Sequence, residues 1–394
     1  MKSKIVGLMA VFFIISCVSI FAMGEQDSAA KGTVLYSVGS YKGKPCYWQN
    51  TVRKNLSIPS GAKEGVASAI NVGDDGTVYI AGYYGDFTED ETTNYPKIEA
   101  SAKPCYWQNG VRKDLPVPSG AKYCEASAIA VETDGTVYVS GNYSDKFRYG
   151  WLYYLFNTCY WKDGGGRISI RDSFTGDGGG YGDAIAVGKD GTVYISGSYG
   201  DDDDYRSPEK KPCYWQNGRR INLPAPAKDN TSHSAAIALG ANGTVYIAGT
   251  TGWSAFGANI KEEGTPCYWQ NGVRKDLPVP SGAEDCEASA IAVGTDGRVY
   301  IAGSYTEWQN NNLIHKICYW QNGVRKELPV PSGAKYCEAS AIAVETDGTV
   351  YVSGSYSYYG NYRNVVVCYW QGNTRYDIST LEESDIYSQF IVIK

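Results

Sequence analysis

Short apolar runs alternate with turn residues through most of the chain, and this alternation predicts paired strands. The run AIAV, beginning at Ala128, is followed by Asp134-Gly135 and then by the segment TVYVSG. A short apolar run bounded by turn residues is typical of a strand buried on both faces. Asp-Gly is a strong hairpin signal because glycine takes the positive φ that a tight turn requires. TVYVSG is rich in β-branched and aromatic residues, so it predicts the second strand of the hairpin.

A second pattern, CYWQNGVRKDLPVP from Cys105, predicts two further strands. CYWQ is the third strand, Asn109-Gly110 forms another tight turn, and VRKDLPV is the fourth strand. Proline in the fourth strand removes a ladder donor, which is tolerated at the edge of a sheet. We name these antiparallel strands a, b, c and d. No stretch after the N-terminal segment shows sustained helical periodicity.

The tripeptide CYW occurs seven times and sets the period of the chain. Successive copies are 59, 54, 54, 54, 51 and 50 residues apart, and they begin at Cys46, Cys105, Cys159, Cys213, Cys267, Cys318 and Cys368. A four-stranded unit that recurs at about 40–50 residues is typical of a β-propeller. The sequence therefore predicts an all-β fold, a seven-bladed propeller of four-stranded antiparallel blades.

The count of strands also predicts how the ring closes. Strands b, c and d each occur seven times, but strand a occurs only six times inside the chain. We expect the C-terminal strand, around residues 390–393, to complete the first blade, which removes an open sheet edge. The propeller would then be a single domain over residues 32–394.

The N-terminus predicts export. Residues 1–24 combine a basic start, a long apolar run and a small-residue cleavage site ending at Gly24, so we expect a signal peptide followed by a short linker, residues 25–31. Two alternatives stay open: the segment ending at Cys17 resembles a bacterial lipobox, and the apolar run is long enough to remain as an uncleaved anchor. Each alternative places the body outside the cytoplasm, as a secreted, periplasmic or outer-surface protein.

The composition of the chain disfavours several classes of binding partner and of catalytic or metal site. The 394-residue chain carries a net charge of −6, so it lacks the positive field that nucleic-acid binding needs. It has only two histidines, His233 and His315, which we expect at the surface in connecting segments. GxSxG, HExxH and P-loop motifs are missing. The aspartate run 201–204 predicts a solvated loop rather than a calcium site. We expect no cofactor, no metal and no catalytic residue.

The cysteines favour burial over a disulfide framework. Eleven occur: Cys17, the seven of the CYW motifs, and Cys124, Cys286 and Cys337, which belong to only three of the units. A disulfide needs Cα atoms within about 7 Å, and equivalent positions of repeated units are not normally that close. A bridge built into the repeat should also recur in every unit. We interpret the CYW cysteines as small buried apolar residues.

The connections between strands b and c vary most in length and composition. They are rich in aromatic residues, glycine and asparagine, which is the composition of an adaptable binding surface. Long surface loops are also simply tolerated, because closure entropy grows slowly with length. As binding-face candidates we take Tyr83, Tyr84, Tyr95, Tyr149, Trp151, Tyr153, Tyr205, Trp253, Trp308, Tyr358 and Tyr359.

The tryptophan of CYW has two interpretations. It can fill the wedge between neighbouring blades, or it can present one sugar-stacking platform per blade. A large aromatic in a mid-sheet strand is usually buried, so we favour the structural role. The residues are Trp48, Trp107, Trp161, Trp215, Trp269, Trp320 and Trp370.

The segment AVGTDGRVYIAGSY, residues 292–305, resembles the units of bacterial β-propeller repeat families, the SBBP and NHL groups. The resemblance covers about one third of each unit and does not include CYWQNGVRKDLPVP. It implies the propeller fold and, more weakly, a binding or scaffolding role, but no catalytic residue.

Together these patterns predict an exported, non-enzymatic propeller. We expect a monomer that binds an extracellular protein or a glycan through its long b–c connections. Membrane contact would come only through a lipid on Cys17 or an uncleaved signal. The alternatives are a secreted lyase or glycan hydrolase that uses the central pocket with His233 or His315, and a lectin with one site per blade.

Overall fold

The computed structural model describes residues 34–50, 52–86, 102–144, 156–170, 180–200, 210–226, 232–252, 264–310, 312–358, 365–377 and 387–393. The predicted signal, Cys17 and the predicted linker lie outside these residues. All regular elements in the described part are β-strands. This part has no helix long and apolar enough to cross a membrane.

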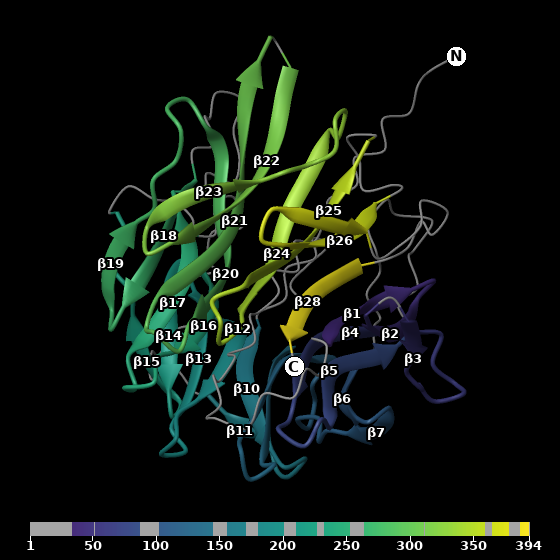
Figure 1. The fold of residues 1–394 in the computed structure, drawn as a ribbon. Coiled ribbons are helices and arrows are strands. Elements are labelled where there is room, and N and C mark those ends of the chain that lie inside the picture. The colour runs from purple at the N-terminus through teal and green to yellow at the C-terminus, as the bar shows by residue number, and fades with distance from the viewer. Residues whose placement is uncertain are drawn as a thin grey trace, which may run out of the picture.

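The strands form seven four-stranded antiparallel sheets arranged as the blades of a propeller (Figure 1). Blades 1 to 3 contain, from strand a to strand d, β28 (Tyr387–Ile393), β1 (Leu35–Tyr41), β2 (Lys44–Gln49) and β3 (Val52–Asn55); β4 (Glu64–Val72), β5 (Val78–Gly85), β6 (Lys103–Gln108) and β7 (Val111–Asp114); and β8 (Tyr123–Val131), β9 (Val137–Ser144), β10 (Asn157–Lys162) and β11 (Ile168–Ser169).

Blades 4 and 5 contain β12 (Gly180–Val187), β13 (Val193–Tyr199), β14 (Lys211–Gln216) and β15 (Arg219–Asn222); and β16 (His233–Leu239), β17 (Val245–Thr251), β18 (Thr265–Gln270) and β19 (Val273–Asp276). Blades 6 and 7 contain β20 (Glu284–Val293), β21 (Val299–Gln309), β22 (Asn312–Gln321) and β23 (Val324–Leu328); and β24 (Tyr336–Val344), β25 (Val350–Ser357), β26 (Val366–Gln371) and β27 (Thr374–Asp377).

The a strands line the axis and close the ring. Each a strand contacts the a strands of both neighbouring blades, and β28 lies between β24 and β4. The C-terminal strand pairs with β1 from Leu35↔Ile393 to Ser40↔Tyr387 (Figure 1). The prediction of a seven-bladed all-β propeller closed by its C-terminal strand is therefore confirmed.

The tight turns use the residues that the repeat supplies at fixed places. In the c–d turn of blade 2, Asn109 and Gly110 have φ of 48° and 81°. The Asn109 side chain also accepts a hydrogen bond from the backbone N–H of Val78, at 2.9 Å. In an a–b turn, the Asp134 carboxylate accepts from the N–H of Thr136 at 2.8 Å, and this bond lowers the Asp134 pKa. The repeated Asn and Asp thus stabilise turns through local bonds.

The CYW tryptophans lie between blades. All seven indoles are at most 3% exposed. Five of them donate Nε1–H to a carbonyl oxygen just after strand d of the preceding blade, at 2.8–3.0 Å: Trp107 to Ser57, Trp161 to Pro116, Trp269 to Pro224, Trp320 to Pro278 and Trp370 to Pro329. The LPVP segment thus supplies both a buried leucine and an acceptor for the next blade.

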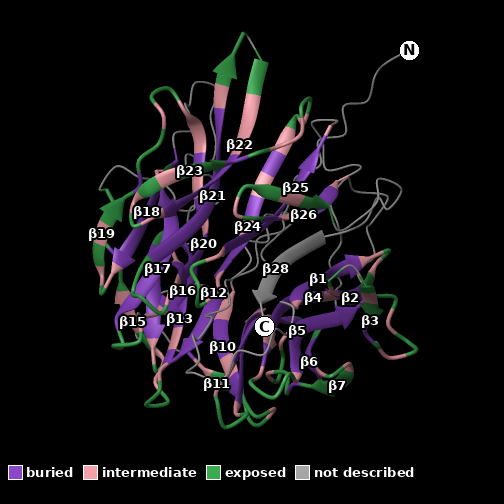
Figure 2. Cartoon of the chain, viewed as in Figure 1, coloured by how far each residue is buried: buried purple, intermediate pink, exposed green. Residues whose placement is uncertain are grey.

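Burial falls from the axis outwards, as Figure 2 shows by the change from purple inner strands to green outer ones. The a, b and c strands carry the core, whereas three of the four residues of the d strand Val111–Asp114 are exposed. The ten cysteines in the described residues are all buried, and none of them forms a disulfide.

Candidate functional site

Every inner strand carries a β-bulge at the same place in its pairing with strand b. Bulges re-aim side chains and are over-represented next to active sites. We call the residue two places before the bulged residue the ring position, because it recurs around the axis. It is Tyr387 in blade 1 and then, in blade order, Val66, Glu125, Tyr181, His233, Glu287 and Glu338.

The backbone at the ring position explains one invariant glycine of the repeat. In blade 3, a Cβ on Gly141 of strand b would overlap the carbonyl oxygen of Glu125, and Trp161 lies against the same spot. The corresponding glycines of blades 2 and 4 to 7 meet the ring-position carbonyl of their own blade in the same way. The scaffold is therefore constant here, whereas the ring-position residue differs among the blades.

The ring position lies on the face where the b–c connections emerge. It belongs to the first half of strand a, and strand b runs antiparallel to strand a, so this end of the blade is where strand b finishes and strand c begins. Variable connections and variable ring-position side chains thus share one face of the propeller. The a–b and c–d turns, which the repeat keeps uniform, lie on the opposite face.

Glu125 is the centre of a buried polar cluster on this face. Its side chain is 2% exposed. One carboxylate oxygen accepts a hydrogen bond from the Tyr123 hydroxyl at 2.7 Å, and the other accepts from Tyr181 at 2.7 Å and from the Asn142 amide at 3.2 Å. Burial raises the Glu125 pKa, and the three donors oppose that rise.

Aromatic rings form an arc beside this carboxylate. Tyr83, Tyr123, Phe156 and Tyr181 contact one another in sequence, edge to face, with ring centroids 6.2, 5.7 and 5.3 Å apart. The arc crosses blades 2, 3 and 4. Tyr83 and Tyr123 are buried, whereas Phe156 and Tyr181 are partly exposed. Glu125 and its hydrogen bonds therefore hold a partly exposed tyrosine, Tyr181, in one orientation.

Three charged or titratable groups continue the cluster into blades 4 and 5. Burial raises the pKa of Asp183 well above its usual range, while the positive charge of Lys210 opposes that rise. One oxygen of Asp183 has no hydrogen-bond partner among the described residues. The partly exposed His233 has its pKa lowered to about 4 by burial and by Lys210, so its imidazole is neutral at pH 7.

Blades 6 and 7 carry a second, more acidic half of the ring. Burial and the neighbouring Glu338 raise the Glu287 pKa to about 7. Glu287 accepts a hydrogen bond from Ser304 at 2.9 Å. Glu338 accepts from Tyr336 at 2.6 Å and from Ser355 at 3.2 Å. Asp285 contributes a third carboxylate, which also raises the Glu287 pKa.

The two predicted histidines lie within strands rather than in connections. His233 begins β16, and His315 is inside β22. Neither is fully exposed, so the expectation of ordinary surface histidines does not describe them. Burial lowers the pKa of both imidazoles. The structure places them in adjacent blades, 5 and 6.

The predicted binding-face aromatics divide into three groups. Tyr83 and Tyr84 lie inside β5 and are 5% and 7% exposed; the Arg112 guanidinium covers the Tyr84 ring, 5.1 Å from its centroid. Trp308 is 59% exposed, and Tyr358 is half-buried. The remaining candidates lie outside the described residues: Tyr95, Tyr149, Trp151, Tyr153, Tyr205, Trp253 and Tyr359.

Sequence reasoning did not single out Glu125, Tyr181, Glu287 or Glu338. A signal for them was present in the repeat itself. The residue two places before the bulge changes among valine, glutamate, tyrosine and histidine, while the AIAV segment that follows hardly changes. A variable position inside an otherwise constant strand indicates a position that the scaffold does not require.

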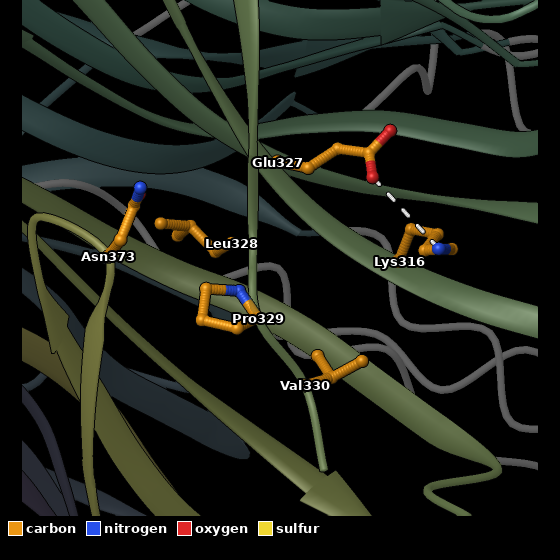
Figure 3. Close-up of a pocket in the computed structure, with 6 residues that line it drawn as sticks. All are labelled: Lys316, Glu327, Leu328, Pro329, Val330 and Asn373. Atoms are coloured by element: carbon orange, nitrogen blue, oxygen red, sulfur yellow. Dashed lines mark ion pairs between the residues drawn. The ribbon is translucent and has the colours of Figure 1, made fainter. Parts of the chain in front are cut away.

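A surface groove of about 620 Å³ lies between blades 6 and 7 (Figure 3). It is lined by Lys316, Glu327, Leu328, Pro329, Val330 and Asn373, and Lys316 and Glu327 form an ion pair of 4.0 Å. These residues come from strands c and d, the segment after strand d and a c–d turn, so the groove does not include the ring position. Among the described residues, no group of three or more His, Cys, Asp or Glu side chains is arranged to hold a metal ion.

No protein-family model matches the chain, and no curated protein sequence matches it. The resemblance to SBBP and NHL repeats is thus supported only at the level of the fold. A solved structure of a polysaccharide lyase, the PL25 ulvan lyase, has a TM-score of 0.51 at 12% identity, over 90% of this chain and 94% of that chain.

Two further solved structures are similar. The PL25 ulvan lyase bound to -[GlcA(1-4)Rha3S]- also has a TM-score of 0.51, at 13% identity and with the same coverage of 90% and 94%. A protein of unknown function from Dyadobacter fermentans DSM 18053 has a TM-score of 0.47 at 11% identity, over 77% of this chain and 93% of that chain. At these identities the likeness concerns the fold alone, and the chain is a seven-bladed β-propeller.

Proposed function

We propose that this protein is an exported, non-enzymatic β-propeller that binds a glycan on the face where its b–c connections emerge. The observation that carries the proposal is the ring position, where a constant scaffold carries side chains of several kinds around the axis. The partly exposed Glu287, Glu338 and His233 suit hydrogen bonding to sugar hydroxyls. Tyr181 and Phe156 are also partly exposed and offer aromatic surface to pyranose rings. The fold-level likeness to polysaccharide lyases supports a glycan over a protein partner.

Charge narrows the class of glycan. The described ring positions contain three glutamates and no lysine or arginine. Electrostatic complementarity disfavours like-charged partners, so a neutral or positively charged glycan fits this face better than a sulfated or uronate-rich one. The sugar bound to the ulvan lyase is anionic, so the negative charge of this face does not suit that sugar.

The arrangement of the tryptophans does not support a lectin with one site per blade. The seven CYW indoles are buried between blades. The amide of the following Gln108 donates to Tyr79 at 3.3 Å, and Asn109 accepts from Val78 at 2.9 Å, so both side chains already serve the blade. The CYW motif therefore does not provide the exposed indole and available amides that a sugar-stacking platform needs.

The test is a glycan array with the full chain, followed by titration of any hit. We expect Glu125→Gln to weaken binding about tenfold, because a neutral amide cannot accept from both tyrosines and so loosens Tyr181. The matched control is Glu132→Gln, which makes the same chemical change at an a–b turn on the opposite face. A parent protein that binds no glycan, or equal affinities for the two folded variants, would overturn the proposal.

A second candidate function, glycan cleavage, is favoured by one observation. His233 keeps a neutral imidazole at pH 7, with Lys210 near it, and a neutral imidazole can accept a proton from a substrate. Turnover of a polysaccharide panel by the parent and by His233→Gln would test this. Product formation that is lost in the variant would establish cleavage, whereas no product from the parent would exclude it.

A further inference from the structure

The b–c connection of blade 6 is a continuous hairpin that projects beyond the rest of the sheet. Its strands β21 and β22 have 11 and 10 residues, whereas the other b and c strands have six to eight. Figure 1 shows this hairpin extending away from the body of the propeller. Near its tip Trp308 is 59% exposed and pairs with Leu313, which is 36% exposed. Trp308 is thus an outward-facing tryptophan in a chain whose CYW tryptophans are buried.

The side chains on one face of this hairpin are held by contacts with neighbouring strands. Directly opposed residues share a face, and so do residues two apart, which groups Trp308 and Leu313 with Thr306 and His315. The Trp308 indole donates Nε1–H to the Glu284 carboxylate at 3.1 Å. The indole edge is therefore oriented, while the ring remains exposed to solvent.

The same face continues toward the axis. The Thr306 hydroxyl donates to Asp285 at 3.3 Å. The His315 ring lies 5.1 Å from the ring of Tyr336, which in turn donates to Glu338 at the ring position. Trp308, His315 and Tyr336 therefore form a track from the hairpin tip to the acidic half of the ring.

Two departures from the repeat coincide in this blade. The segment EDCEAS places Asp285 where the corresponding segments of blades 3 and 7 have Tyr123 and Tyr336. A register shift between Glu284 and Glu287 accommodates Asp285, whose φ is 45°. The nearly duplicated blades 3 and 7 thus keep a tyrosine, whereas blade 6 has a carboxylate at this position and adds a second register shift beside it.

Charge on this face is negative. Glu284 and Asp285 flank the hairpin, and Glu287 follows on the same strand. The nearest lysine of the hairpin, Lys316, belongs to the other face and forms an ion pair with Glu307 at 3.5 Å. An exposed indole beside carboxylates attracts a ligand that combines an apolar ring face with a positive charge.

We infer that this face binds a cationic amino-sugar glycan, with a pyranose ring stacked on Trp308 and its ammonium group facing Glu284 and Asp285. The track through His315 and Tyr336 then leads the glycan chain to the ring position. This inference rests on the proposed glycan-binding function and names the class of glycan. It also gives Trp308 a binding role separate from that of the ring position, because Trp308 lies near the hairpin tip, at the outer end of the track.

The test is calorimetric titration of the full chain with chitosan oligosaccharides at slightly acidic pH, where their amines are protonated. Fully N-acetylated oligosaccharides, alginate oligosaccharides and oligolysine serve as comparison ligands. We expect chitosan to bind most tightly and Trp308→Ala to weaken it about tenfold, with Trp308→Phe intermediate. Glu284→Gln should weaken binding about threefold and reduce its salt dependence. The control variant is Tyr376→Ala, which removes a 42%-exposed aromatic from the outer strand β27.

The outcomes separate this inference from the proposed function. If Glu125→Gln weakens glycan binding but Trp308→Ala behaves like Tyr376→Ala, the hairpin inference fails and the proposed function stands. If chitosan binding depends on Trp308 but not on Glu125, the hairpin inference stands and the part of the ring around Glu125 is not the binding site. Oligolysine binding as tight as chitosan, with no dependence on Trp308, would show charge attraction alone and overturn the inference.

Discussion

Replacing Trp269 by phenylalanine should destabilise the propeller much more than the same replacement of Trp215. The two indoles occupy equivalent places in blades 5 and 4 and are 0% and 1% exposed. Each lies against the invariant glycine of its own strand b, Gly249 or Gly197, in the same way. They differ in one respect: Trp269 donates to the Pro224 carbonyl at 2.9 Å, whereas the Trp215 N–H has no acceptor among the described residues.

The magnitude follows from that difference. Both variants lose the same ring atoms, so the packing and cavity costs are similar and cancel in the comparison. Trp269→Phe also loses a hydrogen bond worth about 1 kcal/mol. Trp215→Phe instead removes a buried donor whose lack of a partner costs about 1–3 kcal/mol. We therefore expect the free energy of unfolding to fall by about 2–4 kcal/mol more in Trp269→Phe than in Trp215→Phe.

Urea denaturation monitored by circular dichroism measures this difference, provided that the m-values of both variants match the parent. If unfolding is irreversible, the comparison is made between unfolding rates at one temperature. The sequence after strand d of blade 3 departs from the repeat: residues 170–173 read IRDS, whereas blades 2 and 4 to 6 read LPVP or LPAP and blade 1 reads LSIP. Equal destabilisation by the two replacements would refute the argument that the LPVP carbonyl stabilises the next blade.

Two further predictions concern the ring and its closure. The pKa of Glu287 is raised from 4.5 to about 7, so the folded state holds more protons than the unfolded state in that window, and the free energy of unfolding falls as pH rises through it. We therefore expect Glu287→Gln to raise the free energy of unfolding by about 1–3 kcal/mol over the parent above pH 7 and to leave it unchanged below pH 4.5. A pH-independent difference between the denaturation curves would contradict this. Deleting residues 387–394 removes β28, leaving β1 with an unpaired edge and β4 and β24 without their shared neighbour, so we expect a poorly soluble or unfolded product; an unchanged cooperative melting transition would rule this out.

The sequence by itself determined the blades. Asp-Gly and Asn-Gly turns, β-branched strands and the CYW period are local signals, and local signals suffice when the same four-stranded unit is repeated. The missing seventh a strand also required only counting, because a closed ring needs as many a strands as b strands. This is why the topology and the closure through β28 could be predicted without any knowledge of packing.

Only the tertiary structure decided where the candidate chemistry lies. Glu125, Tyr181 and His233 belong to different blades, more than 50 residues apart in succession, and only the ring brings successive inner strands together. Tyr83 and Tyr84, expected in a connection, continue strand β5 and are buried there because neighbouring side chains cover them.

The hairpin of blade 6 also has features that only the tertiary structure decided. The sequence of its residues does not predict a pair of long strands. The orientation of the Trp308 indole depends on Glu284, which belongs to another strand. A repeat determines its own fold through contacts that recur in each unit. The side chains that differ between units acquire their neighbours only when the blades close around the axis, because those neighbours come from other blades or distant strands.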